Sequence, residues 1–261
     1  MTLLWRVLVL AAGTLVVAGS LFLLQGFFQL WSELSVHTPS TESWHIITPG
    51  VEERRFLHSP SGTQMIVYRI NPREQQFHLA IKEEARFVSE WFDELSGASL
   101  VFNAAFFHED FSPSGWVKRD GVRHSTRMFD PALSALWSID PTLQLIDTSK
   151  HPPAFEDVIT GLQSYPLLLN DGKRAVATES EKRARRTWIA TGSDAHWYLG
   201  VVSSHEISLF ALADWLEAID LPLVTALNLD GGPSTGVAYH DAPSSLNSLG
   251  PVPIVGWLEP R

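Results

Sequence analysis

The sequence predicts a mixed α/β domain of the α+β class, in which a mixed β-sheet packs against helices. Three observations predict this class. Short β-prone runs bounded by turn residues recur along the chain after Trp44. Two segments carry apolar residues at helical spacing. The chain has 261 residues, which is enough for a single domain with a full core once roughly 35 N-terminal residues are set aside.

The N-terminal segment is apolar and predicts a transmembrane helix. Only small or weakly polar residues interrupt the apolar run Val7–Leu24, and about 18 apolar residues is the lower range for spanning a bilayer. Arg6 precedes the run and no acidic residue occurs before Glu33. The positive-inside tendency therefore keeps the first residues in the cytoplasm and exports the rest. We expect a membrane-anchored protein with an exported domain, either periplasmic or extracellular.

The domain boundaries follow from this segment. We expect residues 1–31 to be the membrane anchor or signal segment, residues 32–43 a polar linker, and residues 44–261 the globular domain. A cleaved signal peptide is the alternative to a retained anchor, because Ala18-Gly19-Ser20 offers small residues at a plausible cleavage site.

Charge and cysteine content limit the function classes. The formal net charge is −10 at pH 7, which argues against nucleic acid as a partner. An anionic ligand would need a local basic pocket. The chain has no cysteine, so it forms no disulfide and has no thiolate chemistry.

Eight runs have the composition of strands. The first two are separated by Asn71-Pro72, which predicts a hairpin or a meander. The polar segment His108–Asp130 is expected to be a long loop or a hairpin over the site. The predicted strands are Met65–Ile70, Gln76–Ile81, Leu100–Phe107, Leu133–Ile139, Tyr165–Leu169, Thr187–Thr191, His196–Ser203 and Leu223–Leu229.

Two segments predict helices. Arg86–Leu95 has large apolar residues spaced four apart. Ser208 is a good N-cap for a helix that runs to about Asp220. Together with the strands on either side, this second helix predicts a βαβ unit. Asp230 then lies just past the carboxyl end of the last strand, where open parallel sheets commonly bind ligands.

The segment Asn228–Gly236 is the most informative part of the chain. A short apolar strand ends in Asp230, which is followed by two glycines and then by hydroxyl residues. Adjacent glycines permit a tight bend and the close approach of a ligand to the main chain. Asp230 at this position is suited to act as an acid, a base or a metal ligand. Asp-Gly is also a common turn dipeptide, so a simple tight turn is the other interpretation.

Two further segments have unusual composition. Asn103 is a poor strand residue inside an apolar run, and the small Ala104-Ala105 that follows leaves room for close approach. One ring of Phe106-Phe107 is expected in the core, and the other is free to stack on a sugar. Arg186 directly precedes the strand Thr187–Thr191. A guanidinium fixed there would suit an anionic ligand.

These segments together resemble the phosphodiester glycosidase family, and the resemblance covers most of the chain after Trp44. Asn103–Phe107 is similar to the family's Asn-Gly-Gly-Phe-Phe, with alanines replacing the glycines. Arg186–Ala190 is similar to its Arg-Thr-Ala-Ile-Gly, and Asn228–Gly232 to its Asn-Leu-Asp-Gly-Gly. Two other segments, Ser114–Gly121 and Ser164–Gly172, also resemble family segments.

The sequence also departs from the family pattern. Pro233 replaces a glycine that is common at this position, and Ala104-Ala105 adds bulk, so the pocket or its substrate is expected to differ. The cysteines of the animal enzyme are absent, which fits a bacterial-type member associated with exopolysaccharide.

The resemblance implies hydrolysis of a sugar-1-phosphodiester in a cell-envelope or exopolysaccharide glycan, with release of the free sugar and a phosphomonoester. A carboxylate beside the anomeric carbon favours the oxocarbenium-like transition state, and Arg186 is suited to the leaving phosphate. Backbone N–H groups of the two glycines, with the hydroxyls that follow, are expected to cradle the phosphate. The expected catalytic residues are Asp230, Arg186 and Asn103; the expected substrate-binding residues are Phe107, His108, Asn228, Gly231, Gly232, Ser234, Thr235 and Arg185.

Several alternatives remain open at this point. We expect no cofactor, although Asp230 and Asp171 together would be able to hold a divalent cation. A non-catalytic, membrane-anchored protein for glycan binding or polysaccharide assembly is the competing class. A serine hydrolase is less favoured, because the residues around Ser234 do not form the nucleophile elbow G-x-S-x-G.

Overall fold

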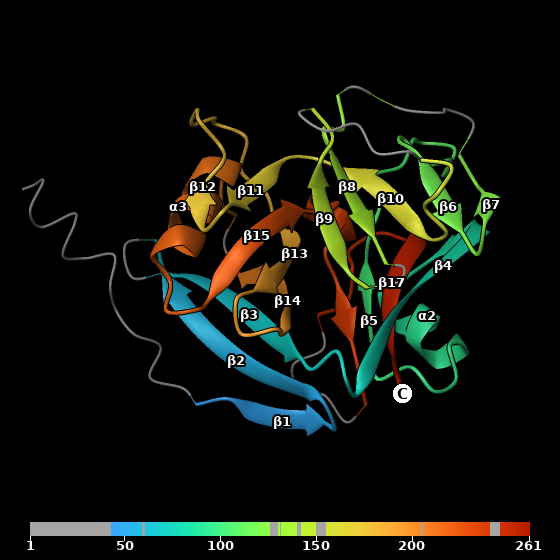
Figure 1. Ribbon diagram of the computed structural model, residues 1–261, viewed down its shortest axis with the longest axis horizontal. Helices are drawn as coiled ribbons and strands as arrows, with labels where there is room; N and C mark the ends of the chain where they lie inside the picture. Colours follow the sequence, from blue (N-terminus) through green and yellow to red (C-terminus); the bar gives the residue numbers. More distant parts are fainter. Residues whose placement is uncertain are drawn as a thin grey trace, which may run out of the picture. The chain divides into compact units, whose positions relative to one another are not determined.

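The chain folds mainly into antiparallel β-structure with two short helices (Figure 1). The computed structural model describes residues 43–58, 61–125, 130, 132–139, 142–149, 155–204, 206–240 and 246–261. The predicted membrane segment and all but the last residue of the predicted linker lie outside these residues. No helix in the described ranges is long and apolar enough to cross a membrane.

The described strands form three sheets. An eight-stranded sheet has the order β1 (His45–Thr48), β2 (Val51–His58), β3 (Thr63–Ile70), β14 (Trp197–Ser204), β13 (Thr187–Gly192), β15 (Leu223–Asn228), β11 (Leu167–Asn170), β12 (Lys173–Arg174). A five-stranded sheet has the order β7 (Val122–Arg123), β6 (Val117–Arg119), β10 (Gly161–Ser164), β8 (Ala135–Ser138), β9 (Gln144–Asp147). A four-stranded sheet has the order β16 (Val237–Ala238), β5 (Leu100–Asn103), β17 (Val252–Pro260), β4 (Gln75–Arg86).

The predicted mixed sheet is wrong in its pairing, because all the hydrogen-bonded strand neighbours in the described residues are antiparallel. The expected βαβ unit has the right order of elements, but β13 lies between β14 and β15 and pairs with both. The two outer strands are therefore parallel without touching. The predicted hairpin around Asn71-Pro72 is also wrong, since β3 pairs with β2 and β14 whereas β4 pairs with β17.

The two predicted helices are present. The first, α2 (Val88–Glu94), lies inside the predicted range and packs against β5, β16 and β17. The second, α3 (Leu209–Ala218), starts as expected, because the Ser208 hydroxyl accepts a hydrogen bond of 3.1 Å from the Ala211 N–H. It lies against β11 and β12 (Figure 1).

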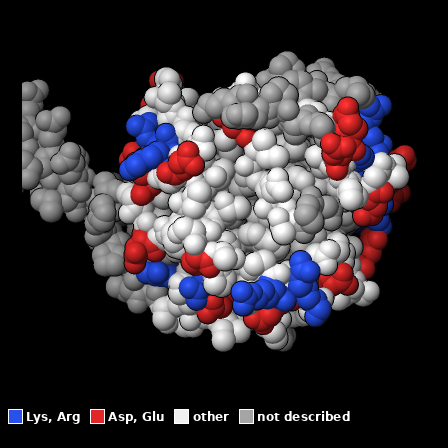
Figure 2. Space-filling model, viewed as in Figure 1, with Lys and Arg blue, Asp and Glu red and all other residues white. Residues whose placement is uncertain are grey.

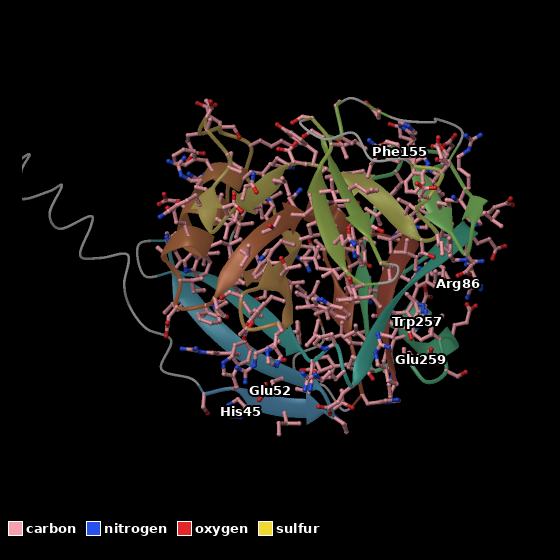
Figure 3. The ribbon with its side chains drawn as sticks, viewed as in Figure 1. His45, Glu52, Arg86, Phe155, Trp257 and Glu259 are labelled. Carbon is pink, nitrogen blue, oxygen red and sulfur yellow. The ribbon has the colours of Figure 1, made fainter. Side chains whose placement is uncertain are left out.

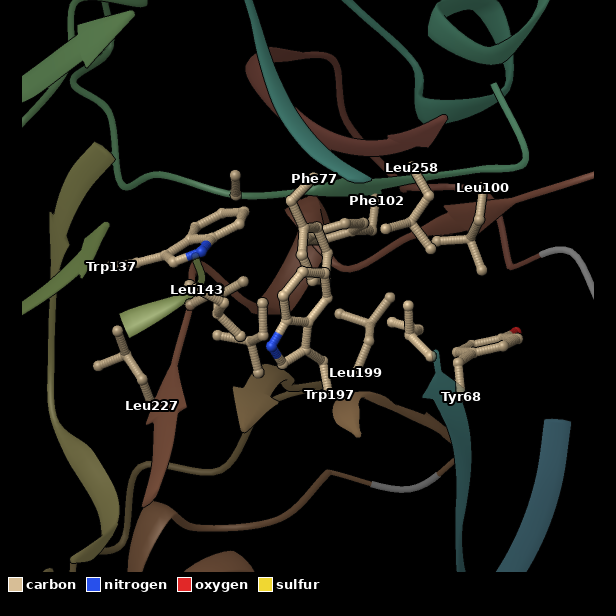
Figure 4. Close-up of a cluster of buried hydrophobic side chains, with 14 of the residues drawn as sticks. Tyr68, Phe77, Leu100, Phe102, Trp137, Leu143, Trp197, Leu199, Leu227 and Leu258 are labelled. Carbon is tan, nitrogen blue, oxygen red and sulfur yellow. The ribbon is translucent and has the colours of Figure 1, made fainter. Parts of the chain in front are cut away.

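The main hydrophobic core is formed by the inner faces of all three sheets (Figure 4). Phe77 from β4 packs edge-on against Trp137 from β8, with ring centroids 5.7 Å apart, and also against Phe102 from β5. Leu227 and Leu229, at and just after the end of β15, pack in the same core. Because burying a large apolar side chain stabilises by about 1.5–3 kcal/mol, this packing fixes where β15 ends and hence where Asp230 lies.

Polar and aromatic side chains on the outer strands make contacts between neighbouring strands, and Figure 3 labels several of these residues. Glu52 on β2 pairs with Arg69 on β3 at 2.6 Å. Trp257 on β17 stacks on His78 of β4, with ring centroids 4.6 Å apart. The predicted long loop or hairpin over the site contains the β6–β7 hairpin.

Candidate active site

The three segments singled out in the sequence come together at the end of β15. The Asp230 N–H donates to the carbonyl oxygen of Ala104, just past β5, at 3.1 Å. The Leu229 N–H donates to the carbonyl oxygen of Thr187 at the start of β13, at 2.9 Å. Segments that lie far apart in the sequence therefore meet at the main chain around Asp230.

The Asn103 side chain fixes the main chain around Asp230. It is fully buried, and its Nδ2 donates to the Asp230 carbonyl oxygen at 2.6 Å. Its Oδ1 accepts from the Thr187 hydroxyl at 2.7 Å and from the Gly236 N–H at 3.1 Å. The amide thus joins β5, β13 and the turn after Asp230. In the structure Asn103 is a positioning residue rather than one that faces a ligand.

Asp230 itself is a partly buried acid with a shifted pKa. Burial disfavours the carboxylate and raises the pKa of Asp230 to about 6. The Ser234 hydroxyl, the Gly231 N–H and the charge of Lys182 each oppose this shift. The Gly231 N–H donates to the carboxylate Oδ1 at 2.8 Å. A carboxyl group that titrates near neutral pH at a fixed position is suited to catalysis.

The two glycines after Asp230 are needed for different reasons. A side chain at Gly231 would come within 2.7 Å of the Arg185 carbonyl oxygen, whereas Gly232 has a φ of +62°, which favours glycine. The Gly231 N–H is bonded to Asp230, and the Gly232 N–H donates to the Arg185 carbonyl oxygen at 2.8 Å. Both N–H groups already have partners within the chain, and the expected phosphate cradle stays a prediction.

Arg186 is buried at the start of β13 and holds two neighbouring segments. Its Nε donates to the Ile207 carbonyl oxygen and its Nη2 to that of Lys182, each at 3.1 Å. Burial lowers the pKa of Arg186, and the charge of Glu206 opposes this shift. Its guanidinium is thus bonded to main-chain oxygens, and Arg186 is not among the groups that shift the pKa of Asp230.

Lys182 is the cation that sequence reasoning missed. It is exposed, yet its charge lowers the pKa of Asp230. The bond from Arg186 to its carbonyl oxygen fixes the backbone at this point. The only signal in the sequence is that Lys182 lies four residues before Arg186 in a basic cluster, a pattern that usually marks a solvated surface.

Arg185 and Thr235 are bonded to each other beside the turn at Gly231. Arg185 Nη2 donates to the Thr235 carbonyl oxygen at 2.7 Å. Within the described part of the chain, Arg185 Nε and the Thr235 hydroxyl are buried without hydrogen-bond partners. Ser234 instead bonds the carboxylate of Asp230.

Asn228 connects the site to the neighbouring strand β11. Its Nδ2 donates to the Tyr165 carbonyl oxygen at 2.8 Å, and its N–H donates to that of Pro166 at 3.0 Å. The side chain is 2% exposed, and its Oδ1 has no hydrogen-bond partner in the described ranges. It precedes Asp230 by two residues, so the two side chains lie on the same face of an extended chain.

Phe107 and His108 lie in a separate turn. The Phe107 ring packs against the small hydrophobic cluster around Trp91 and lies 5.8 Å from the Phe111 ring. His108 is exposed, and its N–H donates to the Ser112 carbonyl oxygen. None of the hydrogen bonds between described residues joins this turn to Asp230. Phe107 is therefore the core-packing member of the Phe-Phe pair.

Asp171 lies at the far end of β15 from Asp230. It occupies the turn between β11 and β12, where the Gly172 N–H donates to the Val224 carbonyl oxygen. Six residues of extended chain, about 20 Å, separate Val224 from Asp230, so the two acids do not share a cation. No group of three or more metal-ligating side chains occurs among the residues that the structure describes.

A cavity of about 620 Å³ lies beside the start of β11. Its lining includes Tyr165, Pro166 and Leu167 together with residues 175–178. Asp230 does not line this cavity, but Asn228 is bonded to its wall. On the face seen in Figure 2, charged side chains gather at the periphery and the middle is uncharged.

A partly buried acid with a pKa near 6, held in place by hydrogen bonds to its main chain from neighbouring segments, defines a candidate enzyme active site. A family model for phosphodiester glycosidases matches residues 96–253, which is well over half of the chain and includes every residue of the Asp230 cluster. The chain therefore belongs to the phosphodiester glycosidase family, a family of hydrolases. No curated protein matches the chain.

Two solved structures share the fold. The catalytic domain of zebrafish N-acetylglucosamine-1-phosphodiester alpha-N-acetylglucosaminidase, auto-inhibited by pro-peptide, has a TM-score of 0.61 and 14% identity, and the match covers 86% of this chain and 87% of that one. A hypothetical protein from Synechocystis has a TM-score of 0.59 and 18% identity, and the match covers 82% of this chain and 63% of that one. This chain thus corresponds to less than two thirds of the Synechocystis protein.

Proposed function

We propose that the chain hydrolyses a sugar-1-phosphodiester and releases the free sugar and a phosphomonoester. The observation that carries the proposal is the partly buried Asp230, with a pKa near 6, in the Asn-Leu-Asp-Gly-Gly segment of a phosphodiester glycosidase family member. The zebrafish protein with the same fold is named for cleavage of an N-acetylglucosamine-1-phosphodiester, and this supports the substrate class.

In the proposed reaction the bond between the anomeric carbon and the phosphate oxygen breaks, and its electron pair leaves with the phosphate. Water forms the new bond to the anomeric carbon, and its proton passes to Asp230 or to the released phosphate. Positive charge develops on the sugar ring, and the Asp230 carboxylate stabilises it as a nucleophile, a base or an electrostatic partner. All three roles require the carboxylate to be ionised.

The leaving phosphate is the anionic part of the substrate. Lys182 supplies the positive charge that it needs, because this side chain is exposed and its charge acts on Asp230. Arg186 supports the reaction indirectly by holding the Lys182 carbonyl oxygen. This assignment replaces direct phosphate binding by Arg186, whose Nε and Nη2 are bonded to main-chain oxygens.

The setting we propose is the cell envelope. The apolar run Val7–Leu24 after Arg6 favours a membrane anchor with an exported domain, and a glycan of the envelope or of an exopolysaccharide is then the accessible substrate. Expressing the full chain fused to a reporter and probing it with external protease tests this setting. Protection of the domain in intact spheroplasts would contradict it.

The decisive experiment is incubation of the full chain with a panel of sugar-1-phosphodiesters, with detection of the free reducing sugar. Parallel reactions contain EDTA or a divalent cation, so that a requirement for a cation in hydrolysis is tested as well. We expect release of sugar by the wild-type protein and about a 10²–10³-fold lower rate for Asp230→Asn. Tight binding without cleavage across the panel would instead favour a glycan-binding or polysaccharide-assembly protein.

A further inference from the structure

Arg185 is a partly buried cation without an acidic partner. Burial lowers the pKa of Arg185 and is the only cause of this shift. None of the ion pairs between described residues includes Arg185. The neighbouring Arg186 differs, because the charge of Glu206 opposes the shift of its pKa. Withdrawing a charge from water without an opposite charge nearby costs free energy, so the setting of Arg185 favours the binding of an anion.

Much of the hydrogen-bonding capacity of Arg185 is unused. Its Nη2 donates to the Thr235 carbonyl oxygen at 2.7 Å and, over a longer distance of 3.4 Å, to that of Asn247. Its Nε is buried and has no partner among the described residues. Its Nη1 makes no hydrogen bond within the described part of the chain either, but it is not one of the buried unpaired atoms. Nη1 therefore carries N–H donors that a ligand can reach.

Arg185 lies against the turn that begins at Asp230. Its carbonyl oxygen accepts from the Gly232 N–H at 2.8 Å, and its Nη2 reaches Thr235 at the end of this turn. Between these two contacts, the Ser234 hydroxyl bonds the Asp230 carboxylate. Arg185 is nevertheless not among the groups that shift the pKa of Asp230, so its guanidinium does not pair with that carboxylate. The cation is held at the same turn as the candidate acid and is left free for an anion of the ligand.

The proposed reaction increases the negative charge of the leaving phosphate. A phosphodiester carries a single negative charge, and the electron pair of the broken bond adds to it, so that a phosphomonoester carries about −1.5 to −2 at pH 7. The Lys182 charge matches the charge that is already present in the substrate. A second cation is needed only as the bond breaks, and an interaction that strengthens in the transition state raises kcat.

Resting on the proposed function, we propose that Arg185 binds the leaving phosphate and stabilises the charge that this group gains as its bond to the anomeric carbon breaks. Nη1 donates to a phosphate oxygen, and the bond from Nη2 to Thr235 holds the guanidinium against the turn. Arg185 lies outside the segment Arg186–Ala190, which resembles the family's Arg-Thr-Ala-Ile-Gly. The assignment is therefore one that the family motif does not make.

The test measures hydrolysis of the methyl ester of N-acetylglucosamine-1-phosphate at pH 8 by the full chain as wild type, Arg185→Gln and Arg183→Gln. Arg183 is exposed, and its substitution removes the same charge two residues away, which makes it the matched control. Methyl phosphate and dimethyl phosphate serve as inhibitors, because the first carries the charge of the product and the second that of the substrate.

We expect Arg185→Gln to lower kcat by about tenfold or more with a smaller change in KM. It should weaken inhibition by methyl phosphate by about tenfold or more, and inhibition by dimethyl phosphate less. The control stays within about twofold of wild type. Loss of the Thr235 bond alone would weaken both inhibitors equally. Equal weakening, or a kcat within about twofold of wild type, therefore overturns the assignment while leaving the hydrolase proposal intact.

If Arg185→Gln does not fold, Arg185→Lys takes its place. Lysine keeps the charge without the planar guanidinium, so the same preferential loss of inhibition by methyl phosphate is expected at a smaller magnitude. Absence of that preference in a folded Arg185→Lys protein also overturns the assignment.

If the wild-type protein does not cleave the ester, the proposed function fails and Arg185 is tested by binding. The phosphorus NMR signal of methyl phosphate is then recorded with each of the three proteins. Broadening by the wild type and by Arg183→Gln, but not by Arg185→Gln, supports an anion site at Arg185. Broadening that is absent, or equal with all three proteins, overturns it.

Discussion

The Asn103 side chain donates a hydrogen bond of 2.6 Å to the main-chain oxygen of Asp230. The same amide accepts hydrogen bonds from Thr187 and Gly236, so one buried side chain joins the three segments around the candidate catalytic acid. A charged group held in this way does not need to reorganise when charge develops on a substrate, which is the condition for electrostatic catalysis.

The first prediction concerns this amide. In Asn103→Asp the carboxylate still accepts from Thr187 and Gly236 but has no donor for the Asp230 oxygen, and two acceptors then face each other. We expect the free energy of unfolding at pH 8 to fall by about 1–3 kcal/mol and hydrolysis to be strongly reduced. Because protonation restores a donor, the loss shrinks as the pH falls towards 5. Equal destabilisation at both pH values in denaturant titrations would show that the Nδ2 donor is unimportant.

The second prediction separates stability from activity at Asp230. Its folded pKa of about 6 lies above the ordinary Asp value, so the folded state binds more protons between about pH 4 and 6 and loses stability as the pH rises through that range. Asp230→Asn removes this cost. We expect it to increase the free energy of unfolding at pH 8 by up to about 3 kcal/mol while abolishing most of the activity.

Thermal unfolding of Asp230→Asn against pH, with kinetics on the same samples, checks this prediction. Asp171→Asn is the matched control, because it makes the same change in the β11–β12 turn of the same sheet. The control is expected to keep wild-type activity. A less stable Asp230→Asn protein at pH 8 would mean that the carboxylate is structurally required.

The parts of the fold predicted from sequence are those fixed by local interactions. The helix α3 was predicted because its cap and its apolar spacing lie within one segment, and the Ser208 cap bond is present at 3.1 Å. The end of β15 shortly before Asp230 is predictable for the same reason. The hairpin at Asn71-Pro72 was predicted wrongly because a turn signal does not determine the sheet that the next strand joins. The partner of β4 is β17, at the far end of the chain.

In the candidate site too, the sequence predicts what local interactions determine and does not show the long-range contacts. The Asn-Leu-Asp-Gly-Gly segment marks Asp230, and local geometry explains both glycines. The partners of Arg186 are not visible in the sequence, because they are carbonyl oxygens of Ile207 and Lys182 that meet it only in the folded chain. The composition of the basic cluster shows the charges but does not show which side chain reaches the acid.

The third prediction concerns Arg186. Lysine keeps the charge but cannot bond the two carbonyl oxygens of Ile207 and Lys182 at once. We expect Arg186→Lys to lower the free energy of unfolding by about 1.5–3 kcal/mol, the range for a lost hydrogen bond to a charged group, and to reduce kcat/KM because Lys182 is displaced. The exposed Arg183→Lys is the control and should be neutral in chemical denaturation and in kinetics. Loss of activity at unchanged stability would instead place Arg186 on the substrate.

The last prediction concerns pH. Because each role proposed for Asp230 requires the carboxylate, kcat/KM is expected to rise with pH through an apparent pKa near 6 and to level off above pH 7. The Lys182 charge lowers the pKa of Asp230, so Lys182→Gln should move this rise to higher pH and also weaken phosphate stabilisation at the plateau.

Arg183→Gln removes the same charge from the next residue and is the matched control, since Arg183 is not among the groups that shift the pKa of Asp230. Profiles of kcat/KM from pH 4.5 to 9 for the three proteins decide the point. An unchanged midpoint in Lys182→Gln, or activity that falls rather than rises through pH 6, would rule out an ionised Asp230 under the influence of Lys182.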